Sequence, residues 1–146
     1  MQALHQALAR GALNDDRVTI LDQGLVYMLT RLHGLDIVKT QCLNTWWTSA
    51  LDDWASTLDV VVHLDAPDEI LVERIRTRHK EHVVKQASRE EACRFLASCR
   101  MSHHEVIAAL TANSGPTVLH FDTGQDSLEQ VAKRVLAFLE SEAAET

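Results

Sequence analysis

The sequence predicts a three-layer α/β domain, with helices on both faces of a mainly parallel sheet. Strand patterns and helix patterns alternate along the chain, as in such domains. Residues 58–64 form an almost continuous apolar run, which is typical of a strand buried on both faces. An aspartate stands at the end of each of three predicted strands, at Asp22, Asp65 and Asp122. Because ligands of open α/β sheets bind beyond the carboxyl ends of the strands, we expect the functional site there.

The amino-terminal part of the chain is expected to contain one strand and three helices. Two leucines four residues apart favour a short helix over 2–10, and residues 18–22 are apolar and β-branched, as in a buried strand that leads into a turn. Helices are expected over 25–35 and 41–57. One face of the second of these carries five apolar side chains: Leu43, Trp47, Ala50, Leu51 and Trp54.

Strand 58–64 is expected to lead directly into a helix. Pro67 and two acidic residues follow the strand, and the start of a helix favours both proline and negative charge. This helix is expected to reach His79. Residues 80–87 show no clean period, and a third strand is predicted over 117–121.

Two capping boxes predict where the last two helices begin. Ser88-x-x-Glu91 opens a long helix, and Ser127-x-x-Gln130 opens the final one. The predicted core face of the long helix consists of Ala92, Phe95, Leu96, Cys99, Val106, Ile107 and Leu110. The final helix is predicted to turn inward Leu128, Val131, Val135, Phe138 and Leu139.

Length, composition and charge exclude several classes of protein. The 146 residues are 46% apolar and 24% charged, which fits a single soluble globular domain over 1–146. No stretch approaches the roughly 18 apolar residues of a membrane-spanning helix. The amino terminus lacks the apolar core of a signal peptide, so a cytoplasmic protein is expected. The net charge of −7 argues against general nucleic-acid binding.

One segment of this acidic chain is basic. Residues 74–100 hold eight of the fourteen lysines and arginines but only three acidic residues. This distribution indicates a local anionic ligand. A solvated helix with charge pairs four residues apart would have the same composition, so both interpretations stay open.

Asp22 is the first candidate catalytic residue. A carboxylate just past a buried strand can hold Mg²⁺ through water, or accept a proton from an attacking hydroxyl in phosphoryl transfer. The alternative is that Asp22 caps the next helix or fixes the turn before Gly24.

Arg74 and Arg78 are the next candidates. They are four residues apart on a predicted helix, so both guanidinium groups are expected on one face. Two such forks suit the oxygens of a transferring phosphate. The alternative is a solvated helix end whose arginines interact favourably with the helix dipole.

The histidines and cysteines predict no metal site. His79-x-x-His82 could be combined with Cys93, His103 and His104, but no second close pair has the spacing of zinc ligands. His103 falls on the inner stripe of the long helix, where we expect a hydrogen-bonded core histidine. The three cysteines are expected to act as small apolar residues.

Four segments together carry a resemblance that none of them carries alone. In chain order they are Val18-Thr-Ile-Leu-Asp22-Gln-Gly24, Leu58-Asp-Val-Val-Val-His-Leu-Asp-Ala-Pro67, Glu73-Arg-Ile-Arg-Thr-Arg78 and Val118-Leu-His-Phe-Asp-Thr-Gly124. With the closing helix, this combination resembles the P-loop nucleoside and nucleotide kinases, such as thymidylate and deoxynucleoside kinases. The similarity covers roughly residues 17–140.

The resemblance implies catalytic roles for three residues. Asp22 would be the strand-end carboxylate that serves as base or is linked to the metal. Gln23 stands where many relatives have an arginine, so one phosphate contact would be lost or moved. Arg74 and Arg78 would stabilise the transferring phosphoryl group, and residues 79–90 would form the mobile lid.

The resemblance also implies a cofactor and its binding loop. Thr123, Gly124 and Gln125 would form the loop that cradles the adenine base. ATP and Mg²⁺ would be the cofactors, and a small-molecule acceptor would receive the phosphate. The acceptor itself and the oligomeric state, a homodimer included, stay open.

The sequence departs from these kinases in one important respect. It contains no Gly-x-x-x-x-Gly-Lys-Ser/Thr, and none of its four lysines follows a glycine. In the kinases the first strand carries this Walker A loop and lies between the strands represented here by 18–22 and 58–64. Both are absent from this sequence, so little or no kinase activity is expected from the 146 residues as written.

Two other classes of protein stay open. One is a non-catalytic module that keeps the kinase fold for interaction or regulation. The other is an α/β domain of another superfamily, which uninterrupted pairing of all three predicted strands would favour.

Overall fold

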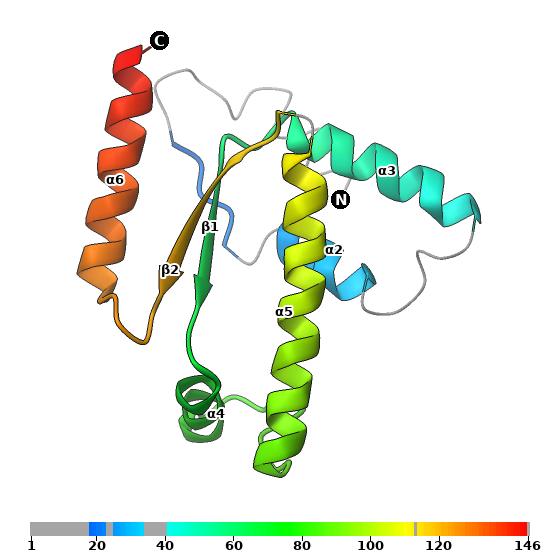
Figure 1. Cartoon of the computed structure of the whole chain (residues 1–146), viewed down its shortest axis with the longest axis vertical. Helices are drawn as coiled ribbons and strands as arrows, with labels where there is room; N and C mark the ends of the chain where they lie inside the picture. The colour runs from blue at the N-terminus through cyan, green and yellow to red at the C-terminus, as the bar shows by residue number, and fades with distance from the viewer. Residues whose placement is uncertain (1–17, 23–24, 34–40, 113, 146) are drawn as a thin grey trace. The chain divides into compact units, whose positions relative to one another are not determined.

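The computed structural model of the chain describes residues 18–22, 25–33, 41–112 and 114–145. Their elements, in chain order, are α2 (Leu25–His33), α3 (Gln41–Ala55), β1 (Val60–Asp65), α4 (Asp68–Thr77), α5 (Arg89–Thr111), β2 (Thr117–Asp122) and α6 (Leu128–Glu145) (Figure 1). This part of the chain is mixed α/β, with five helices and a two-stranded parallel sheet. The helix expected over 2–10 lies outside the described residues.

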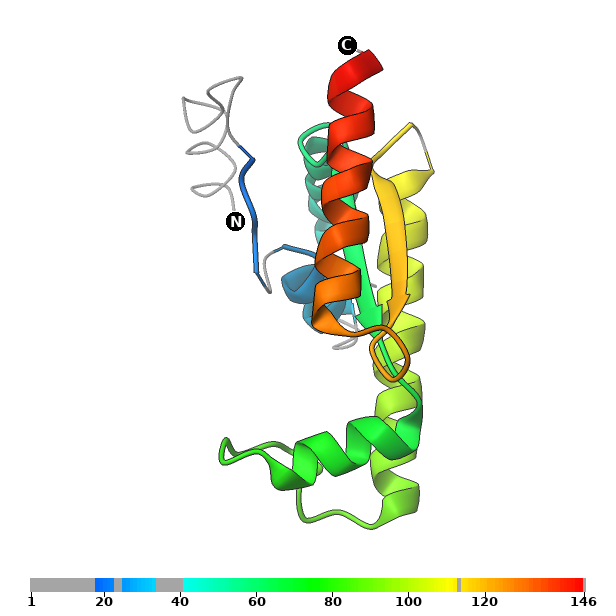
Figure 2. The same cartoon turned by 90° about the vertical axis from the view of Figure 1, so that its left-hand side faces the viewer.

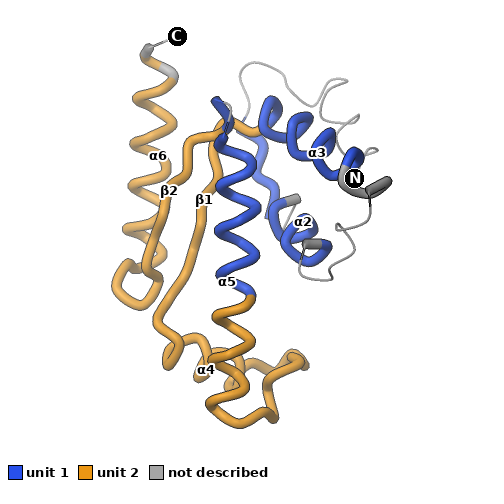
Figure 3. Tube along the Cα trace, turned by 45° about the vertical axis from the view of Figure 1, so that its right-hand side comes forward, with its two compact units in different colours: residues 1–57, 99–115 blue, residues 58–98, 116–146 orange. Residues whose placement is uncertain are grey.

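The chain divides into two compact units (Figure 3). The first consists of residues 1–57 and 99–115, and the second of residues 58–98 and 116–146. Helix α5 therefore begins in the second unit and ends in the first. The second unit contains both strands, so most of the residues that the sequence singles out for function belong to it.

Strands β1 and β2 form the sheet of the second unit. They pair in parallel from Val60 with Thr117 to Asp65 with Asp122, without a bulge. Because facing residues of a parallel pair share one side of the sheet, the two strand-end aspartates lie next to each other. Helix α6 runs alongside the sheet, and α4 crosses beyond the arrowheads of both strands (Figure 2).

The core of the second unit has two parts. Val72 of α4, Val84 of the following segment and Ala92 of α5 are buried together. Half-buried side chains pack against them: Ile75, Ala87, Cys93, Phe95 and Leu96. On the sheet, Phe121 is buried, and the guanidinium carbon of Arg134 on α6 lies 4.5 Å from its ring centroid, which is a cation–π contact.

Both predicted capping boxes are confirmed. The Glu91 carboxylate accepts hydrogen bonds from the backbone N–H and the hydroxyl of Ser88, at 2.9 and 2.8 Å. The same two bonds hold the pKa of Glu91 below its usual value, because they stabilise the ionised carboxylate. At the start of α6, the Ser127 N–H donates to the Gln130 side chain at 2.7 Å, and the Gln130 N–H donates to the Ser127 hydroxyl at 3.2 Å.

The core of the first unit contains apolar side chains from α2, α3 and the later part of α5. They are Leu29, Trp47, Leu51, Trp54, Val106, Ile107 and Leu110. The predicted inner faces of α3 and α5 are thus largely confirmed. His103 is half-buried, and its Nδ1 lies 2.8 Å from the Cys99 carbonyl oxygen, as expected for a hydrogen-bonded core histidine.

Two predictions made from the sequence are wrong. Residues 18–22 form no strand, and Val18 and Ile20 are 69% and 85% exposed. A strand forms only when its backbone finds a partner, and β1 and β2 are the strands that pair in the described part of the chain. Leu128 is 85% exposed instead of inward. It is the first residue of α6, and helical side chains tilt toward the amino-terminal end, so Leu128 projects past the start of the helix.

Candidate functional site

The candidate site lies at the carboxyl ends of the two parallel strands. Each strand ends in an aspartate whose Oδ1 accepts a hydrogen bond from the backbone that follows. Asp65 accepts from the N–H of Ala66, and Asp122 from the N–H of Gly124, both at 2.8 Å. Aspartate favours such turns because its short side chain reaches nearby backbone donors. The two carboxylates therefore hold the backbone that directly follows each strand.

Thr123 joins the two strand ends. Its backbone N–H and its hydroxyl both donate to the carbonyl oxygen of Asp65, at 2.7 and 2.9 Å. The N–H groups of Gln125 and Asp126 both donate to the Asp122 carbonyl, at 2.9 and 2.7 Å. The loop 123–125 is thus held by its own backbone and by the neighbouring strand.

Arg74 connects helix α4 to this loop. One terminal nitrogen of its guanidinium donates to the Thr123 hydroxyl at 2.7 Å, and the other donates to the Thr123 carbonyl at 2.8 Å. The planar fork of arginine supplies two parallel donors, which lysine lacks. Arg74 is half-buried, and its guanidinium places a positive charge next to the loop at the edge of the sheet. The structure thus brings together two predicted site residues, Arg74 and Thr123.

Gly124 lies where no side chain fits without displacement. A Cβ at this position would be 2.8 Å from Cδ1 of Ile70, 2.9 Å from Oδ1 of Asp122 and 3.0 Å from Cδ of Pro67. The loop is therefore pressed against the start of α4, and glycine is the residue that permits this approach.

Asp22 belongs to the first unit, and Arg78 makes none of the contacts described above. Asp22 is exposed in a turn of the first unit. Helix α4 ends at Thr77, and Arg78 is its C-cap residue. The φ of −64° at Arg78 is still helical and its N–H donates to the Arg74 carbonyl at 3.2 Å, so the two side chains leave the helix on the same face, as expected. The ψ of 142° at Arg78 then turns the chain that follows out of the helix. The Arg78 side chain is exposed, while its carbonyl accepts a hydrogen bond from Nζ of Lys85 at 2.6 Å.

The segment expected to form the lid, 79–90, is packed against its own unit. Val84 is 8% exposed and belongs to the core cluster with Val72 and Ala92. The His82 ring stands edge to face on Phe95, with centroids 5.8 Å apart. The segment is also held by hydrogen bonds from Lys85 to the Arg78 carbonyl and from Arg76 to the Ala87 carbonyl.

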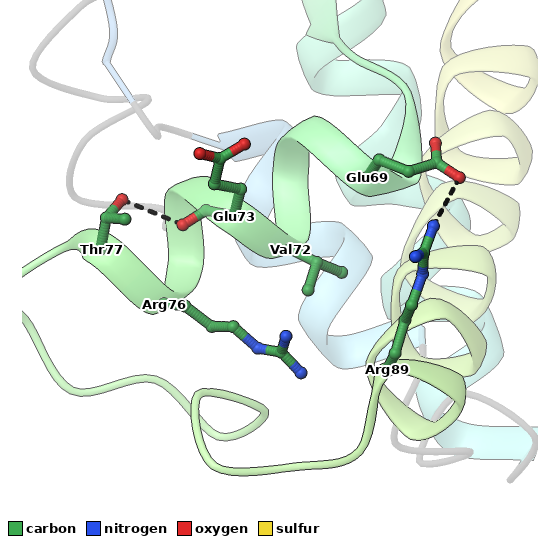
Figure 4. A pocket seen from close by; sticks show the side chains of 6 residues that line it. All are labelled: Glu69, Val72, Glu73, Arg76, Thr77 and Arg89. Carbon is green, nitrogen blue, oxygen red and sulfur yellow. Dashed lines mark hydrogen bonds and ion pairs between the residues drawn. The ribbon is translucent and has the colours of Figure 1, made fainter.

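A shallow pocket of about 200 Å³ lies between α4 and the start of α5 (Figure 4). It is lined by Glu69, Val72, Glu73, Arg76, Thr77 and Arg89. Glu69 and Arg89 form an ion pair of 2.9 Å between two well-exposed side chains. The sequence analysis did not single out these residues. The expected charge pairs four residues apart on one helix do not describe this ion pair, because Glu69 and Arg89 are 20 residues apart and belong to two helices.

Comparison of the chain with protein-family models, with curated proteins and with solved structures found no match. Among the described residues, no helix has both the length and the apolar character needed to cross a membrane.

Proposed function

We propose that this chain belongs to an ATP-dependent phosphotransferase of the P-loop nucleoside and nucleotide kinase type, and that its loop 123–125 binds the adenine base. The observation that carries the proposal is the link between Arg74 and Thr123 beyond the ends of the parallel strands. Ligands of α/β sheets bind at this edge. A loop held by strand, helix and guanidinium offers a preorganised surface for a flat base.

The proposed fold is the three-layer P-loop type, with a further strand beside β1. Val62 and Leu64 of β1 support it, because they are 41% and 53% exposed although strands of parallel sheets are normally covered. In the proposed fold, the strand that carries the Walker A loop would lie next to β1 and its flanking helices would cover these side chains.

Each site residue has a proposed role in phosphoryl transfer. Gln125 is exposed, so its amide is free to approach the edge of the base. Arg74 supplies positive charge next to this loop, and Arg78 would reach the phosphoryl group when the segment 79–90 closes. Asp22 would accept the proton of the acceptor hydroxyl or hold Mg²⁺ through water. The Walker A loop would supply the remaining phosphate contacts.

The adenine site is tested by nuclear magnetic resonance. ATP with Mg²⁺ is titrated into the 146-residue protein while the backbone amide signals are followed. We expect the largest shifts at Thr123, Gly124 and Gln125, and a weaker response in Arg74→Ala. Arg76→Ala is the matched control, because Arg76 lies on the same helix and donates to the Ala87 carbonyl instead of to the loop. Unchanged loop amides, or equal losses in both variants, would reject the adenine site.

The catalytic part is tested on the protein with its upstream reading frame. We expect a Gly-x-x-x-x-Gly-Lys-Ser/Thr in that frame, ATP-dependent phosphorylation of a nucleoside or nucleotide, and loss of turnover in Asp22→Asn. The acceptors tested are the common nucleosides and nucleotides. If the extended protein binds ATP but transfers phosphate to none of them, the non-catalytic alternative takes the place of the kinase proposal.

A further inference from the structure

A pair of histidines faces each other across the two strands. His63 of β1 and His120 of β2 are register partners, so both side chains lie on the same side of the sheet. Their Nδ1 atoms are 3.2 Å apart, and their rings meet edge to face with centroids 5.2 Å apart. One Nδ1 therefore carries a proton and the other offers its lone pair. Neither residue belongs to the proposed adenine site.

The separation of the two nitrogens is the one that a shared metal ion requires. Two imidazole nitrogens that bind one ion at about 2.0–2.1 Å lie about 3.3 Å apart in tetrahedral geometry and about 2.9 Å apart at a right angle. The 3.2 Å found here falls between these values. Because both residues sit inside paired strands, the backbone already holds the two rings together, so little ordering is needed when a metal binds.

We propose that His63 and His120 form a two-histidine binding site for a borderline divalent metal ion of the Zn²⁺, Ni²⁺ or Cu²⁺ class. Imidazole nitrogen suits these ions, whereas Mg²⁺ and Ca²⁺ prefer oxygen. On binding, the proton between the two Nδ1 atoms moves to Nε2 of the same ring, so both rings stay neutral and both Nδ1 lone pairs bind the ion.

The site is an open one. No group of three or more histidine, cysteine, aspartate or glutamate side chains is placed to hold a metal ion in the part of the chain that the structure describes. The next pair along the same side of the sheet, Asp65 and Asp122, uses its Oδ1 atoms for the turns described above. Since no third side chain of the described residues is placed to bind the ion, its remaining coordination positions are open to water or to a small ligand.

The test uses Zn²⁺ and the 146-residue protein, produced without a histidine tag and kept reduced. The ring nitrogens of the histidines are followed by ¹⁵N magnetic resonance during the titration. We expect the Nδ1 signals of His63 and His120 to change together, from a shared proton to metal coordination, and millimolar Mg²⁺ to leave them unchanged. If the two Nδ1 signals do not move with zinc, or if they move independently of each other, no such site exists.

Single substitutions give a second measurement. His63→Gln and His120→Gln should each weaken zinc binding at the remaining histidine by about tenfold or more, because one imidazole alone cannot chelate. His79→Gln is the control, since His79 is exposed and lies outside the sheet. Equal zinc affinity of His120 in the parent and in His63→Gln would overturn the proposal. Because the ring signals of the parent protein test it independently, the proposal does not depend on the folding of any variant.

Discussion

Arg74 and Thr123, 49 residues apart in sequence, are joined by two hydrogen bonds of 2.7 and 2.8 Å at the carboxyl ends of the parallel strands. The arginine for which the resemblance to the kinases implies a phosphate contact thus also positions the loop for which it implies a contact with the base. Both assignments remain proposals, but the geometry makes them one site instead of two. The link also has consequences for stability that are independent of any nucleotide.

Removing the Arg74 guanidinium should destabilise the protein. Arg74→Ala leaves the Thr123 hydroxyl and carbonyl without their donors, and hydrogen bonds from charged donors contribute about 1.5–3 kcal/mol each when well shielded. Because Arg74 is half-buried, we expect a total loss of about 1–3 kcal/mol in the free energy of unfolding, measured with urea. Arg74→Lys should recover less than half of it, because an ammonium lacks the planar fork.

Arg78→Ala provides the control for this prediction. Arg78 lies just past the same helix with an exposed side chain, so its loss should change the free energy of unfolding by less than about 0.5 kcal/mol. Similar losses in Arg74→Ala and Arg78→Ala would mean that the link to Thr123 contributes little.

Gly124→Ala should destabilise the protein through close contacts in the loop. The new Cβ would lie 2.8 Å from Cδ1 of Ile70 and 2.9 Å from Oδ1 of Asp122, so the ends of these side chains have to move, and with them the bond from Asp122 to the loop. Overpacking of this kind costs about 1–3 kcal/mol. Ile70→Val removes the clashing Cδ1, so the double variant should be less destabilised than the sum of the two single variants. If the losses of unfolding free energy in the two single variants simply add up in the double variant, the contact with Cδ1 of Ile70 does not cause the effect of Gly124→Ala.

Val84 should hold the segment 79–90 in place. Val84→Ala shrinks a buried side chain of the core cluster and should cost about 1–2 kcal/mol, with faster amide hydrogen exchange across the segment. Val83→Ala is a control of the same chemistry one residue away, because Val83 is 76% exposed and should change little. Equal exchange rates in both variants would contradict a role for Val84 as an anchor.

The capping box of α5 should make stability depend on pH. The Ser88 hydroxyl and N–H lower the pKa of Glu91 in the folded protein below its usual value of 4.5. A carboxylate whose pKa falls on folding adds stability above the unfolded value and loses it as the pH falls through the folded value. The stability advantage of the parent over Glu91→Gln should therefore be full near neutral pH and disappear at pH values below the lowered pKa.

Urea unfolding between neutral pH and about pH 3 measures this advantage directly. Glu90→Gln is the control, because it removes an acidic charge from the first turn of the same helix outside the box. If both variants follow the same pH profile, the effect belongs to the helix dipole and not to the bonds with Ser88.

Local signals in the sequence were enough to place most elements. The capping residues Ser88 and Ser127 fixed two helix starts, because their bonds to the residue three positions on depend only on nearby chain. The buried stripe Val106, Ile107 and Leu110 followed from helical spacing for the same reason. Strands β1 and β2 were found within two residues of their observed bounds.

Tertiary structure decided what depends on distant partners. Residues 18–22 have the composition of a strand, but a strand needs another backbone to bond with, and composition does not say whether one is present. The pairing of His63 with His120 and the reach of Arg74 to Thr123 both follow from the register of two strands 57 residues apart. The sequence by itself thus determined the α/β pattern and the strand-end residues, and only the folded chain decided which of them meet.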